Sequence, residues 1–180
     1  MMDEICAHIA DLVVNSISAG AKHIKVSIEK SNVKNELFVK VSDDGKGMDE
    51  STLKHVIDPF FSTKTGRKVG LGIPLLKGTA ETCGGSFNIK SIQGKGTDIM
   101  ASFQLSHPDL PPLGNVKDTI LVLSISNPEV DFFFDIKNDI MSFTFNTKEI
   151  KTLLDGLPIN SPEVIKFLKN YLDEHLDFFN

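Results

Sequence analysis

The chain has 180 residues, of which 41% are hydrophobic and 24% are charged, a composition typical of a folded globular protein and not of a disordered or collagen-like one. No apolar run reaches the ~18–20 residues that a membrane span needs, and the acidic start of the chain lacks the basic segment of a signal peptide. The formal net charge of −5 argues against nucleic-acid binding, which uses basic surfaces. We therefore expect a cytoplasmic protein in which Cys6 and Cys83 are reduced and buried.

The composition changes near residue 107. Residues 1–107 hold 13 basic and 12 acidic residues and 11 of the 13 glycines, whereas residues 108–180 hold 6 basic and 12 acidic residues. The proline-rich stretch from His107 to Asn115 can continue neither a helix nor a central strand. We expect an N-terminal domain over residues 1–107, a linker over 108–116 and a small acidic α+β extension over 117–180.

The first segment combines helical periodicity with alternating strands. Its expected helices span residues 3–18, 50–56 and 73–83, and its expected strands span residues 23–29, 37–42, 86–92 and 98–105. This order predicts an α+β fold, a two-layer sandwich of a mostly antiparallel sheet with helices on one face.

The acidic extension is expected to contain both kinds of element. Residues 117–126 read as a strand, and a strand hairpin is expected over 130–136 and 141–145. Helices are expected over 148–154 and from Pro162 to about residue 176. We expect this extension to serve a partner or assembly role and to lie outside the catalytic machinery.

Four short stretches of the first segment carry groups that suit ligand binding. Asp11 and Asn15 share a helix face, where a carboxylate and an amide could hold Mg²⁺. Residues 43–47 place two acids before glycines that allow close approach to a ligand. Residues 70–72 open a helix, whose free N–H groups attract anions, and residues 94–97 join two strands. Taken singly, each stretch also fits an ordinary helix face, loop or turn.

The order and spacing of these stretches resemble the GHKL superfamily of gyrase, heat-shock chaperone, histidine-kinase and mismatch-repair ATPases. Residues 11–21 are similar to the mismatch-repair form of the first motif. The stretch from Pro59-Phe60-Phe61-Ser62-Thr63-Lys64 to Thr97 is similar to the histidine-kinase form, which makes histidine-kinase-like ATPase domains the nearest match. The resemblance covers residues 3–105 and implies a Bergerat fold that binds ATP beneath a mobile lid.

The resemblance also implies a role for individual residues. Asn15 matches the asparagine that coordinates Mg²⁺, Asp43 matches the acid that accepts a hydrogen bond from the adenine amino group, and Thr97 matches the threonine that supports this acid through a water. The other implied ATP contacts are Gly45, Gly47 and Met48 near the base, Gly70, Leu71 and Gly72 at the phosphates, and Lys64 and Lys68 in the lid.

Two acids depart from the family pattern. Asp11 stands where the hydrolysing members have a glutamate that acts as general base, and its side chain is one methylene shorter. It is therefore a candidate general base whose role is in doubt. Asp44 stands where the family often has asparagine, and it is expected to add negative charge near the metal.

The resemblance leaves three classes of function open. The favoured one is a stand-alone ATP-binding domain acting on a partner protein in signal transduction, either as a regulatory kinase similar to the anti-sigma-factor kinases or as an ATPase. The alternatives are a non-catalytic adaptor that ATP gates and a slow ATPase switch of the mismatch-repair type that works as a homodimer. The partner protein is not identified by the sequence.

Overall fold

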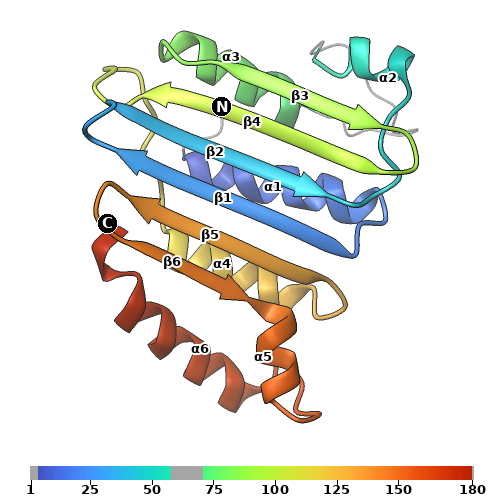
Figure 1. Cartoon of the computed structure of the whole chain (residues 1–180), viewed down its shortest axis with the longest axis vertical. Coiled ribbons are helices and arrows are strands. Elements are labelled where there is room, and N and C mark those ends of the chain that lie inside the picture. Colours follow the sequence, from blue (N-terminus) through green and yellow to red (C-terminus); the bar gives the residue numbers. More distant parts are fainter. Residues whose placement is uncertain (1–3, 58–70, 180) are drawn as a thin grey trace.

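Six strands form one sheet in the order β3-β4-β2-β1-β5-β6 (Figure 1). The computed structural model describes residues 4–57 and 71–179. The strands are β1 (His23–Ser31), β2 (Glu36–Asp43), β3 (Phe87–Ile92), β4 (Gly96–Gln104), β5 (Asp131–Asn138) and β6 (Ser142–Asn146). Among these six strands of the described residues, only β1 and β5 pair in parallel, so the predicted mostly antiparallel sheet is confirmed.

Three of the helices form a second layer against one face of this sheet. The helices are α1 (Ile5–Ser18), α2 (Glu50–His55), α3 (Gly72–Thr82), α4 (Val116–Ser126), α5 (Thr147–Leu153) and α6 (Pro162–His175), followed by the 3₁₀ turn η1 (Asp177–Phe179). Helices α1, α3 and α4 lie behind the strands in Figure 1, and α1 contacts both of the others. None of the helices within residues 4–57 and 71–179 has the length and apolar character needed to cross a membrane.

Helix α1 positions the residues of interest because it is amphipathic. Ile5, Ile9 and Val13 are almost fully buried against the sheet, which leaves the polar face of the helix turned away from the core. The backbone N–H groups of Ile5 and Cys6 donate to carbonyl oxygens in the 108–116 segment, at 3.0 and 2.9 Å. This segment thus satisfies N–H groups that the first turn of the helix leaves without partners.

The C-terminal segment, residues 117–180, contributes to the same sheet and the same core. Strand β5 lies beside β1, with Ile24 opposite Phe132 and Val26 opposite Phe134. All four side chains are almost fully buried, within one cluster that also contains the buried residues of α1. The hairpin of β5 and β6 was predicted from the sequence and is confirmed.

The prediction of a strand over residues 117–126 is wrong, because these residues form helix α4. The β-branched composition favours a strand, but Val116, Ile120 and Leu123 follow helical spacing and are buried between the sheet and the neighbouring helices. The side chain of Asn115 accepts a hydrogen bond from the N–H of Asp118, which caps the helix start.

Candidate functional site

The polar face of α1 lies between the end of β2 and the start of α3. Near the C-terminal end of α1, the hydroxyl of Ser16 donates to Asp43, the last residue of β2. Closer to the N-terminus of α1 than Ser16, the carboxylate of Asp11 lies against Gly72, the first residue of α3. Helix α1 therefore connects two of the stretches that the sequence singled out.

At the β2 end of the site, two hydrogen bonds fix the carboxylate of Asp43. Its Oδ2 accepts from the Ser16 hydroxyl at 2.7 Å, and its Oδ1 accepts from the N–H of Gly45 at 2.8 Å. Because a carboxylate oxygen can accept more than one hydrogen bond, both oxygens keep acceptor capacity in a fixed orientation. Thr97 is the residue opposite Asp43 in the β2–β4 ladder, so the structure brings these two predicted residues together.

Ser91 connects Thr97 to Met48, another residue that the sequence predicts at the site. Its hydroxyl lies 2.8 Å from the hydroxyl of Thr97 and accepts a hydrogen bond from the N–H of Met48, also at 2.8 Å. The loop after Asp43 is thereby held against β3 and β4. Sequence reasoning missed both Ser91 and Ser16, because an isolated serine in a strand or helix carries no pattern that marks it as a site residue.

The glycines of this loop allow close packing between segments. Gly47 has a φ of +61°, and a side chain there would overlap the carbonyl of Ile92 at the end of β3. At Gly45, a Cβ atom would lie 3.1 Å from both the side chain and the carbonyl oxygen of Ala19. The structure thus assigns both glycines a packing role, against β3 and against the end of α1.

At the α3 end of the site, Asp11, Asn15 and Gly72 come together. The amide nitrogen of Asn15 donates to Oδ2 of Asp11 at 3.3 Å, and the same oxygen blocks the position where a side chain of residue 72 would stand. Leu71 precedes the first turn of α3 and is exposed. The predicted contacts Lys64, Lys68 and Gly70 lie outside the residues that the structure describes.

The side-chain oxygen atoms of Asp11 and Asn15 are suitable ligands for a hard cation. Carboxylate and amide oxygens are ligands that Mg²⁺ accepts, and Mg²⁺ is commonly held by one or two protein groups together with water and phosphate oxygens. Within residues 4–57 and 71–179, no group of three or more His, Cys, Asp or Glu side chains is placed to hold a metal. The arrangement therefore fits a metal that arrives with a phosphate ligand better than a metal held by protein groups alone.

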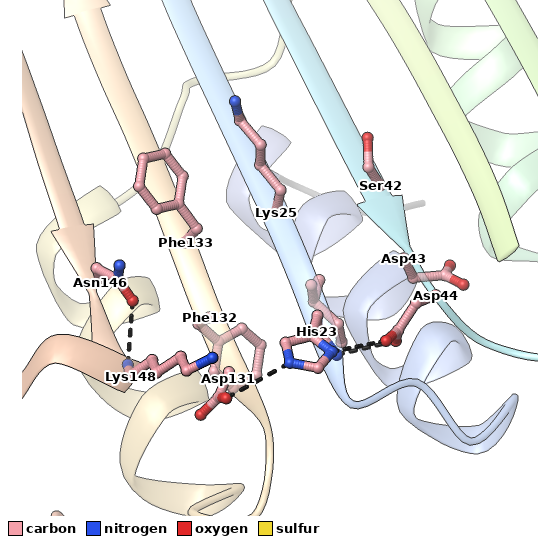
Figure 2. A pocket seen from close by; sticks show the side chains of 11 residues that line it. His23, Lys25, Ser42, Asp43, Asp44, Asp131, Phe132, Phe133, Asn146 and Lys148 are labelled. Atoms are coloured by element: carbon pink, nitrogen blue, oxygen red, sulfur yellow. Dashed lines mark hydrogen bonds and ion pairs between the residues drawn. The ribbon is translucent and has the colours of Figure 1, made fainter. Parts of the chain in front are cut away.

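Asp44, which the sequence led us to expect near the metal, has its partners at the start of β1. Its side chain turns toward the start of β1, whereas Asp43 turns away from it (Figure 2). The Asp44 carboxylate accepts from the N–H groups of Lys22 and His23 and lies 2.7 Å from Nδ1 of the His23 ring. The two neighbouring acids therefore have separate partners, because the Asp43 carboxylate accepts from Ser16 and from the N–H of Gly45.

His8 is the other unusual polar residue of α1. Its side chain is only 2% exposed, and neither ring nitrogen has a hydrogen-bond partner among the described residues. Burial lowers the pKa of this imidazole, and the charge of nearby Asp11 opposes that shift only in part. The ring is therefore held in its neutral form beneath the polar face of the helix.

Comparisons with known proteins agree with this geometry. The family model described as histidine kinase-, DNA gyrase B- and HSP90-like ATPase matches residues 3–107. The sensor histidine kinase ZraS of Salmonella typhimurium is 32% identical over 95 residues, which cover 52% of this chain and 20% of that kinase. Sporulation kinase C of Bacillus subtilis is 32% identical over 87 residues, which cover 48% of this chain and 20% of that kinase.

Among solved structures, the Aquifex aeolicus MutL ATPase domain complexed with ADP has the same fold. The likeness covers 86% of this chain and 70% of that chain, with a TM-score of 0.55 and 13% sequence identity. It therefore extends beyond the segment that the family model matches. The two kinases are similar over only a fifth of their own length, and the rest of those proteins has no counterpart in this comparison.

Proposed function

Because the chain belongs to the family of histidine kinase-, DNA gyrase B- and HSP90-like ATPases, we propose that it binds ATP with Mg²⁺ along the polar face of α1. The observation that carries this proposal is the fixed carboxylate of Asp43, held by Ser16 and by the N–H of Gly45. The MutL domain of the same fold was solved with ADP, which supports a nucleotide as the ligand class.

The fixed carboxylate suits adenine. Ionised carboxylate oxygens accept hydrogen bonds and donate none, so Asp43 pairs with the exocyclic amino group of adenine. Guanine carries a carbonyl oxygen at the equivalent position, and two acceptors facing each other repel. A site built on such a buried polar contact discriminates strongly against the ligand that cannot satisfy it.

The phosphates are proposed to lie at the other end of the helix face. The N-terminus of α3 offers N–H groups to an anion, and Asn15 together with Asp11 holds the Mg²⁺ that accompanies the phosphates. When bound, Mg²⁺ neutralises part of the phosphate charge. Asp11 lies beside Gly72, which supports it as the group that orients a water near the terminal phosphate.

Calorimetric titration with MgATP and MgGTP tests this proposal. We expect the wild-type chain to bind ATP more tightly than GTP, and we expect Asp43→Asn to lose most of the ATP affinity, since an amide satisfies the site only in part. Asp98→Asn is the matched control, because Asp98 is a half-exposed acid next to Thr97 that pairs with Lys40. Equal binding of ATP and GTP by the wild-type chain would contradict the proposal.

We further propose that the chain uses bound ATP to act on a partner protein. It does so either as a regulatory protein kinase of the anti-sigma-factor-kinase kind or as an ATPase. The similarity to two kinases supports this reading, although it covers only the ATP-binding segment. The acidic C-terminal segment is proposed to supply the partner or assembly surface, which includes self-association as a homodimer.

Labelled ATP distinguishes these activities. Proteins captured by the immobilised chain with and without MgATP are incubated with γ-labelled ATP. Label on a captured protein supports the kinase, and partner-dependent release of labelled phosphate supports the ATPase. Capture that depends on ATP, with neither label transfer nor phosphate release, would overturn both and favour an adaptor that ATP gates.

A further inference from the structure

Three strand ends meet around His23. His23 begins β1, Asp131 begins β5 beside it, and Asp44 directly follows β2. These residues line a cavity of about 390 Å³ (Figure 2). This group joins the loop that carries Asp43 to the C-terminal segment.

The imidazole of His23 lies between two carboxylates. Its Nδ1 is 2.7 Å from Oδ2 of Asp44, and its Nε2 is 3.6 Å from Oδ2 of Asp131. Figure 2 shows the ring bridging the gap from β5 to the loop after β2. The first distance is that of a strong hydrogen bond, whereas the second is longer than a hydrogen bond.

The Asp44 carboxylate is anchored to the start of β1 from several directions. Its Oδ1 accepts from the backbone N–H groups of Lys22 and His23, at 2.8 and 2.9 Å, in addition to the ring contact at Oδ2. Partial burial raises the pKa of Asp44, but these hydrogen bonds outweigh it and lower the pKa to about 2. The anchor is therefore an ionised carboxylate at neutral pH.

Asp131 is anchored on the other side of the ring. Its backbone N–H donates to the carbonyl of Lys22 at 2.8 Å, and its Oδ1 lies 2.9 Å from Nζ of Lys151 in α5. Lys151 also donates to the carbonyl of Val130. A continuous series of contacts thus runs from α5 through Asp131 and His23 to Asp44.

We propose that His23 is a positioning residue for nucleotide binding, which sets the orientation of the Asp43 carboxylate through Asp44 and makes it depend on the C-terminal segment through Asp131. This inference rests on the proposed function. Asp44 stands between Asp43 and Gly45, the two residues that form the base-binding end of the site. Asp44 directly follows Asp43, so hydrogen bonds that hold the Asp44 side chain to the start of β1 also hold the backbone from which the Asp43 side chain extends.

Three substitutions of His23 separate positioning from general stability. Asn places an amide nitrogen near the position of Nδ1 and keeps the donor to Asp44, Gln places its amide near the position of Nε2, and Ala removes both. We expect the dissociation constant for ATP to rise roughly three- to tenfold in His23→Ala, the size of one net hydrogen bond, with a reduced preference over GTP. We expect His23→Gln to resemble the Ala variant and His23→Asn to restore the wild-type values.

Asp131→Asn tests the dependence on the C-terminal segment. This variant weakens the contact to the ring while leaving Asp44 and His23 in place, so we expect a smaller loss of ATP affinity in the same direction. His107→Ala, in the turn after β4, is the control that leaves the affinity unchanged. Thermal unfolding of each variant shows whether it is folded at the temperature of the titration.

The outcome is read against the wild-type chain in the same titration. Loss of affinity in His23→Ala with recovery in His23→Asn supports the proposal. It is overturned if folded His23→Ala binds ATP with the wild-type affinity and the wild-type preference over GTP, or if the Asn variant is as weak as the Ala variant. If the wild-type chain itself binds no ATP, the proposed function fails. If the wild-type chain binds ATP and the substitutions leave that binding unaltered, only the role of His23 fails.

Discussion

The carboxylate of Asp11 fills the space in front of the Cα atom of Gly72, so the first residue of α3 can have no side chain while Asp11 keeps its place. This contact joins the polar face of α1 to the helix terminus that we propose as the phosphate site. The glycine is therefore required by its neighbour, and this requirement leads to a direct test.

We expect Gly72→Ala to displace the Asp11 carboxylate and to raise the dissociation constant for MgATP by about tenfold or more, because the added Cβ overlaps the carboxylate. Gly78→Ala is the matched control in the same helix, where a Cβ atom meets nothing within 4 Å. The control should keep the affinity and gain up to about 1 kcal/mol of stability from helix propensity. Equal affinity in the two variants, measured by calorimetry, would refute the role given to this contact.

We expect Asn15→Ala to remove the magnesium-dependent part of ATP binding while the fold is kept. Asn15 lies on the polar face of α1, partly exposed, so its truncation should cost little stability. The measurement is ATP affinity with Mg²⁺ and with a chelator, for the wild-type chain, Asn15→Ala and the control Ser18→Ala. Ser18 is exposed, and its hydroxyl donates to the carbonyl of Val14 in its own helix. An unchanged magnesium dependence in Asn15→Ala would show that the metal is held elsewhere.

Two substitutions of Asp11 are expected to change the rate of ATP turnover in opposite directions. If Asp11 orients the attacking water, Asp11→Asn should abolish ATP turnover, whereas Asp11→Glu should increase it. The longer side chain restores the reach of the family glutamate, and a displacement of about an ångström can change a rate by about 10²-fold. Single-turnover release of phosphate is the measurement. Turnover that survives in Asp11→Asn would assign the water to another group.

His8 makes stability depend on pH. Its pKa is lowered in the folded state by burial, so the unfolded chain binds a proton more readily once the pH falls below about 6.5. The stabilisation is therefore complete above that pH and decreases as the pH falls, by at most about 1.4 kcal/mol per pH unit for one group. Urea unfolding at pH 7.5 and 5.5 should show a smaller loss for His8→Leu than for the wild-type chain or for the control His107→Gln, at a half-exposed histidine. Equal losses in all three would show that His8 is not the titrating group.

Much of the fold follows from local patterns in the sequence. Alternation of apolar residues predicts β1 and β2, and helical spacing predicts α1, because these periods are imposed by a single buried face. Helix α4 is predicted as a strand, since the β-branched residues Ile120, Val122 and Ile125 favour extended structure, whereas the burial of Ile120 and Leu123 along one side of the segment favours the helix. The parallel pairing of β1 with β5 joins residues 108 positions apart, such as His23 and Asp131, and no local pattern reports such a contact.

The residues of the candidate site also divide into those that the sequence indicates and those that only the fold reveals. Glycines and acids at fixed spacing indicate Asp43, Gly47 and Thr97, because a close approach of backbones restricts which residue fits. Ser16 and His23 could not be found in this way, since their importance arises from the carboxylates that the fold places beside them. A serine or histidine at the surface of an isolated helix or strand carries no such signal.

The parallel pair of β1 and β5 also bears on how the chain reaches its folded state. The edge of β1 that faces β5 gains its hydrogen bonds only after the chain has returned from 108 residues away, so the segment that matches the ATPase family must wait for sequence outside that match. Contacts between such distant residues carry a large entropic cost of loop closure and slow the folding of a domain. Until β5 arrives, β1 presents unpaired N–H and C=O groups that another chain can bind, which makes the interval before closure the period in which the protein is most prone to aggregate.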